Sequence, residues 1–171
     1  IGWAWKASFT VFNLTSAARG LLNLRSETLP CAWKSLALRI KTNRAYRSRR
    51  YDVYLPTGSP VNARPILFFP GLAVDHAAYS EPSALLADAG FLVVVVSAEP
   101  LRLVDIGLPA FWSFTLQQLQ RTIERRHKCA STWVLLRHSV GAFACTMFAV
   151  PLGATDIVLW GAAPFLDCMD D

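Results

Sequence analysis

One stretch, Thr132 to Val150, restricts the fold more than any other part of the chain. Residues 132–136 are apolar, β-branched or aromatic, which is typical of a short buried strand. Three polar residues follow at 137–139, and residues 142–150 are small and apolar enough to form a helix. A strand, an abrupt turn and a helix in this order predict that Ser139 lies at the tip of the turn, above the carboxyl end of the strand.

This order is the layout of a nucleophile elbow, whose pattern is Gly-x-Ser-x-Gly. In an elbow, the first N–H groups of the following helix face the oxyanion that develops during the reaction. Gly141 supplies the small residue after the serine, but Arg137 stands where the first glycine belongs. Its side chain must either point away from the strand–helix crossing or push the crossing open. A short pattern also recurs by chance, so the motif alone leaves open an ordinary buried strand followed by a helix.

The composition is that of one globular domain. The chain has 171 residues, of which 53% are hydrophobic and 17% charged. Its longest strictly apolar run, Phe91 to Val96, is far shorter than the ~20 residues of a membrane-spanning helix. The four cysteines form no Cys-x-x-Cys pair, which predicts reduced, mostly buried thiols, no metal and no cofactor, and points to an intracellular protein. Because the chain starts at Ile1 and not at Met, a lost targeting segment stays open and the compartment stays undetermined.

Charge divides the chain into two regions. Residues 1–64 carry eleven Lys or Arg against two acids, a net +9, whereas residues 65–171 carry six against ten, a net −4. We expect a basic, apolar helical segment over residues 1–34 and an α/β domain over residues 35–171. We expect the first segment to be a helix packed on the domain. A helix that lies in a membrane interface stays open as the alternative.

Residues 35–56 predict an antiparallel hairpin. Leu36, Leu38 and Ile40 alternate with polar or small residues, and a second alternating run spans residues 51–55. The basic run between them, 43–50, could contact nucleic acid or anionic lipid. We expect it to be the solvated face of the hairpin, with no nucleic acid partner, and leave open a weak membrane contact through residues 1–50.

The rest of the chain alternates strands and helices. Apolar runs predict buried strands at 65–69, 91–96, 132–136 and 157–161, and helices are predicted at 80–90 and 110–127. Strand, helix and strand in this order require a parallel sheet with right-handed crossovers. The prediction is a three-layer α/β/α sandwich whose mostly parallel sheet carries an N-terminal antiparallel hairpin.

From about Ile66 onward the chain resembles the α/β-hydrolases, specifically the dienelactone-hydrolase-like subgroup. The resemblance lies in four segments that occur in the family's order. They are Phe69–Leu72 with Val74–Asp75 and Ala78–Tyr79, Ala89–Val94 with Pro100–Leu101, Trp133–Gly141, and Ile157–Trp160.

The resemblance implies a role for each of the matching residues. Ser139 would attack an ester-like carbonyl of a small carboxylic ester or lactone. The backbone N–H groups of Leu72 and Val140 would hold the oxyanion, and Gly71 would allow the loop to approach closely. The residues implied to support the loop and the elbow are Asp75, Tyr79, His138 and Gly141.

The chain also departs from the family, in which the acid and the histidine of the triad follow the nucleophile. No histidine follows Ser139, and Asp167 is the best acid candidate after it. Of the three histidines, we expect His76 to face solvent and His127 to end a helix as a favourable positive charge. Two explanations stay open: a truncated domain that has lost the acid and histidine, or a degenerate, non-catalytic fold.

Two functions follow from these patterns. The first is a serine-hydrolase-type domain, incomplete here, that turns over little or no substrate on its own. The alternative is a non-catalytic α/β module that binds an acidic partner or a membrane surface through its basic N-terminal region. The sequence does not determine the oligomeric state.

Overall fold

The structure is a computed structural model that describes residues 28–59, 63–71, 74–97, 109–138 and 148–160, with side chains described from 113 onward in the fourth range. Its helices are α2 (Pro30–Lys41), the 3-10 helix η2 (His76–Tyr79), α3 (Ser80–Asp88) and α5 (Pro109–His127). Its strands are β1 (Ala45–Arg47), β2 (Tyr51–Tyr54), β3 (Pro65–Phe69), β4 (Leu92–Val96), β5 (Trp133–His138) and β6 (Ala154–Trp160).

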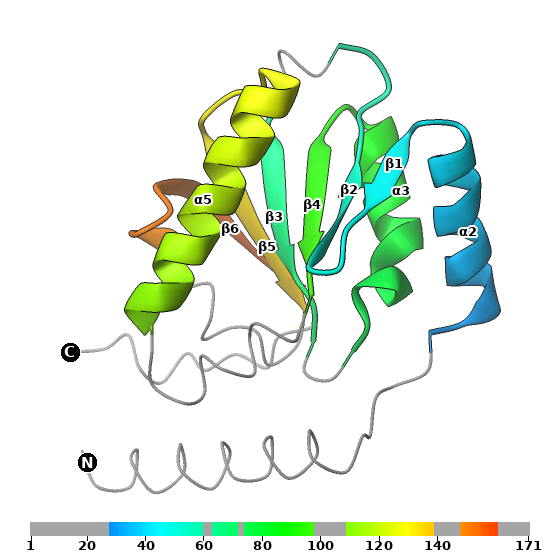
Figure 1. Cartoon of the computed structure of the whole chain (residues 1–171), viewed down its shortest axis with the longest axis horizontal. Helices are drawn as coiled ribbons and strands as arrows, with labels where there is room; N and C mark the ends of the chain where they lie inside the picture. Colours follow the sequence, from blue (N-terminus) through cyan, green and yellow to red (C-terminus); the bar gives the residue numbers. More distant parts are fainter. Residues whose placement is uncertain (1–27, 60–62, 72–73, 98–108, 139–147, 161–171) are drawn as a thin grey trace, which may run out of the picture.

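All six strands form one sheet in the order β1-β2-β4-β3-β5-β6. The pairs β4–β3, β3–β5 and β5–β6 are parallel, while β1–β2 and β2–β4 are antiparallel. Helix α5 covers one face of the sheet, and α2 and α3 cover the other (Figure 1). The predicted α/β fold, with a mostly parallel sheet and an antiparallel hairpin, is therefore confirmed.

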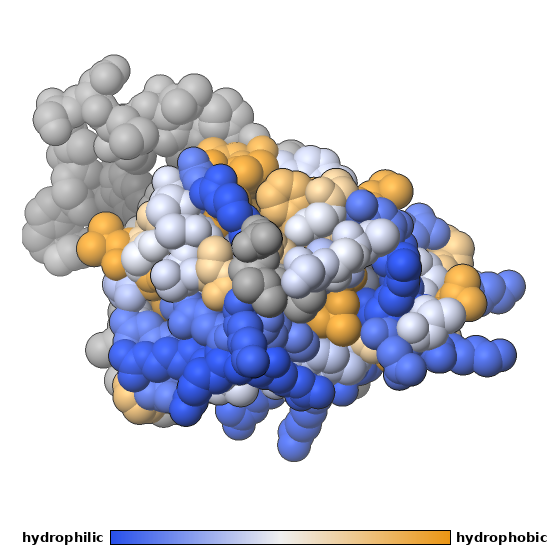
Figure 2. All heavy atoms as spheres, turned by 90° about the horizontal axis from the view of Figure 1, so that it is seen from above, coloured by the Kyte–Doolittle hydropathy of each residue, from blue (hydrophilic) through white to orange (hydrophobic). Residues whose placement is uncertain are grey.

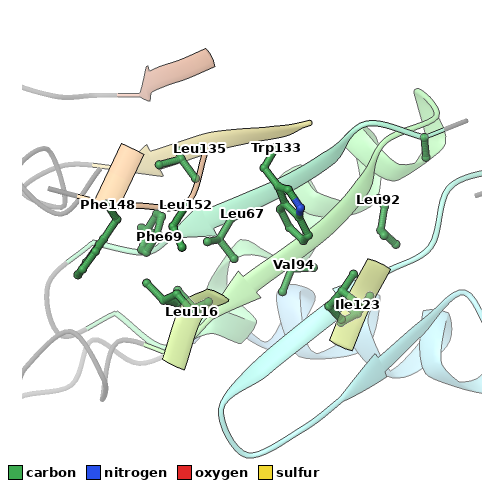
Figure 3. Packing of buried hydrophobic residues seen from close by; sticks show 13 residues of the cluster. Leu67, Phe69, Leu92, Val94, Leu116, Ile123, Trp133, Leu135, Phe148 and Leu152 are labelled. Carbon is green, nitrogen blue, oxygen red and sulfur yellow. The ribbon is translucent and has the colours of Figure 1, made fainter. Parts of the chain in front are cut away.

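The core has two halves, one on each face of the sheet. In β4 the residues Leu92, Val94 and Val96 pack toward α5, while Val93 and Val95 pack on the opposite side. On the α5 side, Leu116 and Ile123 of the helix meet side chains of β3, β4 and β5 (Figure 3). Because β4 is buried on both faces, its continuous run of β-branched residues is the pattern that a central strand needs.

The strands predicted for the α/β body and the helices predicted at 80–90 and 110–127 are present with shifted ends, whereas most of the helix predicted at 142–150 lies outside the described residues. Strand β5 continues past residue 136 to His138, and β6 begins earlier than predicted, at Ala154. Helix α3 stops where Gly90 adopts a φ of +98°, a conformation that favours glycine, as its place in the sequence predicted. Strand β6 lies at the end of the described sheet, and Ile157, Val158, Leu159 and Trp160 are all more than two-fifths exposed.

The predicted hairpin over residues 35–56 is wrong in its first half. Residues 30–41 form α2, and the hairpin pairs the much shorter β1 with β2. The alternation of Leu36, Leu38 and Ile40 was misleading, because the buried positions are Ala32 and Leu36, one helical turn apart. Pro30 in the first turn and basic residues in the last turn also suit a helix. Helix α2 crosses the boundary expected at residue 34, and the division into two segments stays a prediction.

Candidate functional site

The carboxyl ends of β3 and β5 meet at one edge of the sheet. Phe69, the last residue of β3, lies opposite Arg137 of β5 in the parallel register. Gly71 follows β3 by two residues, and His138 ends β5. The loop after β3 and the residue before Ser139 therefore come from neighbouring strands. Ser139, Val140, Gly141 and Leu72 themselves lie outside the described residues, as does Asp167.

Tyr79 joins these two strand ends. Its hydroxyl accepts a hydrogen bond from the backbone N–H of Gly71 at 2.8 Å and lies 3.1 Å from Nδ1 of His138. The hydroxyl can donate its single proton to Nδ1 or accept from an N–H there, according to which ring nitrogen of His138 carries the hydrogen. Burial raises the pKa of Tyr79, so the phenol stays neutral and keeps this proton.

Gly71 is placed so close to its neighbours that a side chain would not fit without movement. A Cβ at this position would lie 3.2 Å from both Nδ1 of His138 and the Tyr79 hydroxyl. Close approach therefore accounts for a glycine at this position. The Tyr79 ring also packs edge-on against Phe68 and Trp160, at centroid distances of 4.8 and 6.4 Å, which holds it against the sheet.

Arg137, the departure from the elbow pattern, is fully buried. It belongs to β5, between Leu136 and His138, so its long side chain is accommodated inside the domain and is not turned to solvent. The sequence had left two possibilities for this residue, and the burial shows that the interior makes room for it. The strand–helix crossing itself lies outside the described residues.

A second cluster of polar side chains lies on the same face of the sheet as Tyr79 and was missed by the sequence analysis. Asp52 of β2 is fully buried, with Nε of Arg47 at 3.5 Å and Nε2 of His76 at 3.4 Å. Arg47 also lies 3.3 Å from Asp75 and donates to Nε2 of His76 at 2.9 Å. The expectation that His76 faces solvent is wrong, because only 6% of it is exposed.

Burial raises the pKa of Asp52 to about 7, and the nearby Arg47 opposes the shift. Neither carboxylate oxygen makes a hydrogen bond among the described residues. The alternation Tyr51-Asp52-Val53 is typical of a strand whose polar residue faces outward. It is buried because β2 lies between β1 and β4 and is covered by η2, a contact between distant segments that no local pattern reveals.

Asp75 has a structural role that can be assigned directly. Its carboxylate accepts a hydrogen bond from the backbone N–H of Ala77 at 2.8 Å and so caps the first turn of η2. The same oxygen, Oδ1, faces Arg47. Asp75 thus links the polar cluster to the short helix that carries Tyr79.

The other histidine and the thiols differ in part from expectation. His127 ends α5 as predicted, but burial and the adjacent Arg126 lower its pKa, so the neutral ring is favoured over the expected positive charge. Its Nε2 lies 3.0 Å from the Tyr46 hydroxyl.

Among the cysteines, Cys31 is exposed, contrary to prediction, and Cys129 is half-buried; the other two lie outside the described residues. The described residues hold no group of three or more acidic, His or Cys side chains arranged for a metal ion.

No protein-family model matches the chain, and a search of curated proteins gives no match either. Solved structures do resemble it. The crystal structure of DphMB1 aligns with 70% of this chain and 44% of its own, with a TM-score of 0.51 and 19% identity. A highly thermostable carboxyl esterase from Bacillus coagulans, solved in complex with glycerol, aligns with 67% of this chain and 42% of its own, with a TM-score of 0.51 and 14% identity.

At these identities the likeness shows the fold alone, an α/β architecture with a mostly parallel sheet. The chain spans less than half the length of either structure. The finer assignment to the dienelactone-hydrolase-like subgroup stays a prediction.

Proposed function

We propose that this chain carries the nucleophile and the oxyanion loop of a serine-hydrolase-type domain that acts on small carboxylic esters or lactones. The dienelactone-hydrolase-like subgroup is the one its motifs favour. The observation that carries the proposal is the bridge made by Tyr79 between Gly71 and His138. It holds the loop after β3 beside the residue that precedes Ser139, which is the arrangement that an attacking serine and an oxyanion donor require.

The bridge also narrows the choice of oxyanion donors. The N–H of Gly71 is already donated to Tyr79, so it cannot serve an oxyanion at the same time. The next N–H along this loop belongs to Leu72, and we assign it as one donor, with Val140 as the other. In a working site each donor of this kind contributes about 3 kcal/mol to the transition state.

We assign no base for Ser139 among the described residues. Both ring nitrogens of His76 face partners in the polar cluster, His127 pairs with Tyr46, and Nδ1 of His138 is taken by Tyr79. A serine without a base is a weak nucleophile at neutral pH. We therefore expect the purified chain to react with an activated phosphonate slowly and to turn over little or no ester.

The test is labelling by a fluorophosphonate probe, followed by intact mass and peptide mapping. The proposal expects one adduct per chain, on Ser139, that Ser139→Ala removes. Ser131→Ala is the matched control, because this exposed serine lies at the opposite end of β5, and it should label as the parent does. No adduct, or an adduct that persists in Ser139→Ala, refutes the proposal. Rapid hydrolysis of a short nitrophenyl ester that depends on Ser139 would instead refute the low turnover.

The alternative function rests on the exposed cations. Arg49 and Arg50 at the β1–β2 turn are exposed, as are Arg125 and Arg126 near the end of α5. Arg126 lies 4.3 Å above the Tyr46 ring, so α5 and the hairpin are neighbours, and hydrophilic side chains cover a broad area of the molecule in Figure 2. Within the described part of the chain, no helix has the length and apolar character to cross a bilayer.

This basic surface supports, as the second proposal, binding to an acidic partner or to an anionic membrane surface. Arg47 does not belong to it, because it pairs with Asp52 and Asp75. Salt-sensitive binding to vesicles with anionic lipid that is lost in the Arg49→Ala, Arg50→Ala variant supports this function. Unchanged binding in that variant contradicts it.

A further inference from the structure

The polar cluster around Asp52 lies at one end of η2, and the bridge of Tyr79 lies at the other. His76, the first residue of η2, contacts Asp52 of β2, while Tyr79, its last residue, contacts His138 of β5. Residues three apart in a 3-10 helix lie on the same side, so both side chains face the sheet. The side chains of this short helix therefore connect the amino end of β2 with the carboxyl end of β5.

The hairpin holds η2 through Arg47. The guanidinium lies 3.5 Å from Asp52 on the neighbouring strand and 3.3 Å from Asp75, which caps η2. Arg47 also stacks at 4.5 Å on the Trp33 ring of α2, which restricts where it can point. One planar cation thus connects β2, α2 and the first turn of η2.

We propose that Arg47 and Asp52 are positioning residues that set the placement of the oxyanion loop through η2 and Tyr79. This inference rests on the proposed function for its catalytic meaning. A shift of η2 moves the Tyr79 hydroxyl and, with it, the Gly71 peptide that this hydroxyl holds. Neither Arg47 nor Asp52 touches the reacting atoms, and both act through the loop.

The groups that face Asp52 come from several elements. They are Arg47 from β1, His76 from η2, Asp75 from the cap of η2, and Tyr54 from its own strand, while β4 presents Val95 opposite it. Ionised Asp52 attracts Arg47 and protonated Asp52 does not. The ion pairs through which Arg47 positions η2 should therefore strengthen as the carboxyl of Asp52 loses its proton. Protection of the Gly71 amide should therefore rise with pH through neutrality.

The test is Asp52→Asn, which keeps the shape of the side chain and removes its charge. At pH 8, where Asp52 of the parent chain is ionised, amide exchange at Gly71, followed by NMR and corrected for intrinsic exchange, should be faster in the variant by about fivefold to tenfold, the factor that corresponds to one ordinary hydrogen bond. The rise of protection with pH should disappear. Labelling of Ser139 should slow by about tenfold, because small misplacements of a catalytic group cost up to about a hundredfold in rate.

Asp88→Asn is the matched control, because Asp88 also pairs with an arginine, Arg39, but lies exposed at the end of α3. It should change neither the exchange at Gly71 nor its pH dependence. If Asp52→Asn does not fold, Arg47→Gln tests the same link. Arg47→Lys should then recover part of the protection, because it restores the charge without the planar fork.

The two proposals fail in different ways. If the parent chain is not labelled at Ser139, the proposed function fails, and the exchange at Gly71 alone decides whether the cluster positions the loop. If Asp52→Asn leaves the exchange at Gly71 and its pH profile as in the parent chain, the positioning role is refuted, whether or not Ser139 reacts.

Discussion

The Tyr79 hydroxyl contacts both Gly71 and His138, and we expect the placement of Gly71 to depend on it. It is 2.8 Å from the Gly71 nitrogen and 3.1 Å from Nδ1 of His138, and a Cβ on Gly71 would come within 3.2 Å of both partners. The hydrogen bond and the close approach therefore act on the same atoms. Substitutions at Gly71 and Tyr79 should not be independent, because residues that share a contact couple by about 0.5–3 kcal/mol.

This coupling gives a prediction at the residue scale. Tyr79→Phe leaves the buried N–H of Gly71 without its acceptor and should lower the free energy of unfolding by about 1–3 kcal/mol. Gly71→Ala forces its neighbours apart and should cost about 1–3 kcal/mol as well. The double variant should lose less than the sum, because removing the hydroxyl relieves one of the two contacts. Urea denaturation of the four proteins measures the coupling.

Tyr46→Phe is the control for loss of a phenol hydroxyl, since that group contacts His127 in a half-buried place. It should cost less than Tyr79→Phe, about 1 kcal/mol or less. Strict additivity of the Gly71 and Tyr79 substitutions would show that the hydroxyl does not constrain Gly71.

At the scale of elements, the apolar residues of α2 fit both the two-residue period of a strand and the 3.6-residue period of a helix. As a strand, Leu36 and Leu38 would share one face; in α2 they lie on different sides. Leu36 is 1% exposed and packs with Tyr54 and Phe68, whereas Leu38 is 62% exposed. The helix also brings Trp33 to Arg47 and so contributes to the polar cluster.

A matched pair of substitutions distinguishes the two readings. Leu36→Ala should lower the free energy of unfolding by about 2–5 kcal/mol, since it removes a buried side chain from a packed cluster. Leu38→Ala, the same change two residues away, should alter it by less than about 0.5 kcal/mol. Urea denaturation of both variants provides the measurement. Similar losses for the two would favour the strand reading over the helix.

The parts of the fold that the sequence predicted are those with long or one-sided apolar patterns. The runs at β3 and β4 and the helix α5 are read from their own residues, because burial on both faces or on one helical side leaves a local signal. Gly71 and Tyr79 were singled out in the sequence through a resemblance to a family, and no local pattern indicates the contact between them. The contacts of Asp52, Arg47 and His76 could not be predicted, because they join segments 5 to 29 positions apart whose approach depends on the packing of η2 over the sheet.

At the scale of the whole molecule, three of the described acids act on the pH dependence of stability in opposite directions. Ion pairs and hydrogen bonds lower the pKa of Asp88, through Arg39 first, and of Asp156, through Arg64 first. These groups contribute stability above their unfolded pKa and lose it as the pH falls through the lowered value. Asp52 changes stability with pH in the opposite direction, because burial raises its pKa from 3.8 to about 7.

Proton linkage determines how Asp52 changes the free energy of unfolding with pH. Between about pH 4 and pH 7 the folded chain holds a proton on Asp52 that the unfolded chain has released, so folding is favoured at the lower pH. As the pH rises through about 7, the buried carboxyl must ionise and this contribution is lost. His127 acts oppositely, because its lowered pKa makes stability rise as the pH rises toward the value of an unfolded histidine.

Asp52→Asn isolates the contribution of one carboxyl from the others. In the parent chain, the free energy of unfolding should fall between pH 5 and pH 8 by an amount on the order of 1–4 kcal/mol that is missing from the variant. The variant should accordingly be at least as stable as the parent at pH 8. If Asp52 positions the loop, the Gly71 amide of the variant should nevertheless be less protected from exchange at this pH. Urea denaturation of both proteins at several pH values, with Asp88→Asn as control, measures the difference. Parallel pH profiles for the parent and Asp52→Asn would show that the buried carboxyl does not titrate in this range, and the pH dependence expected at Gly71 would lose its source.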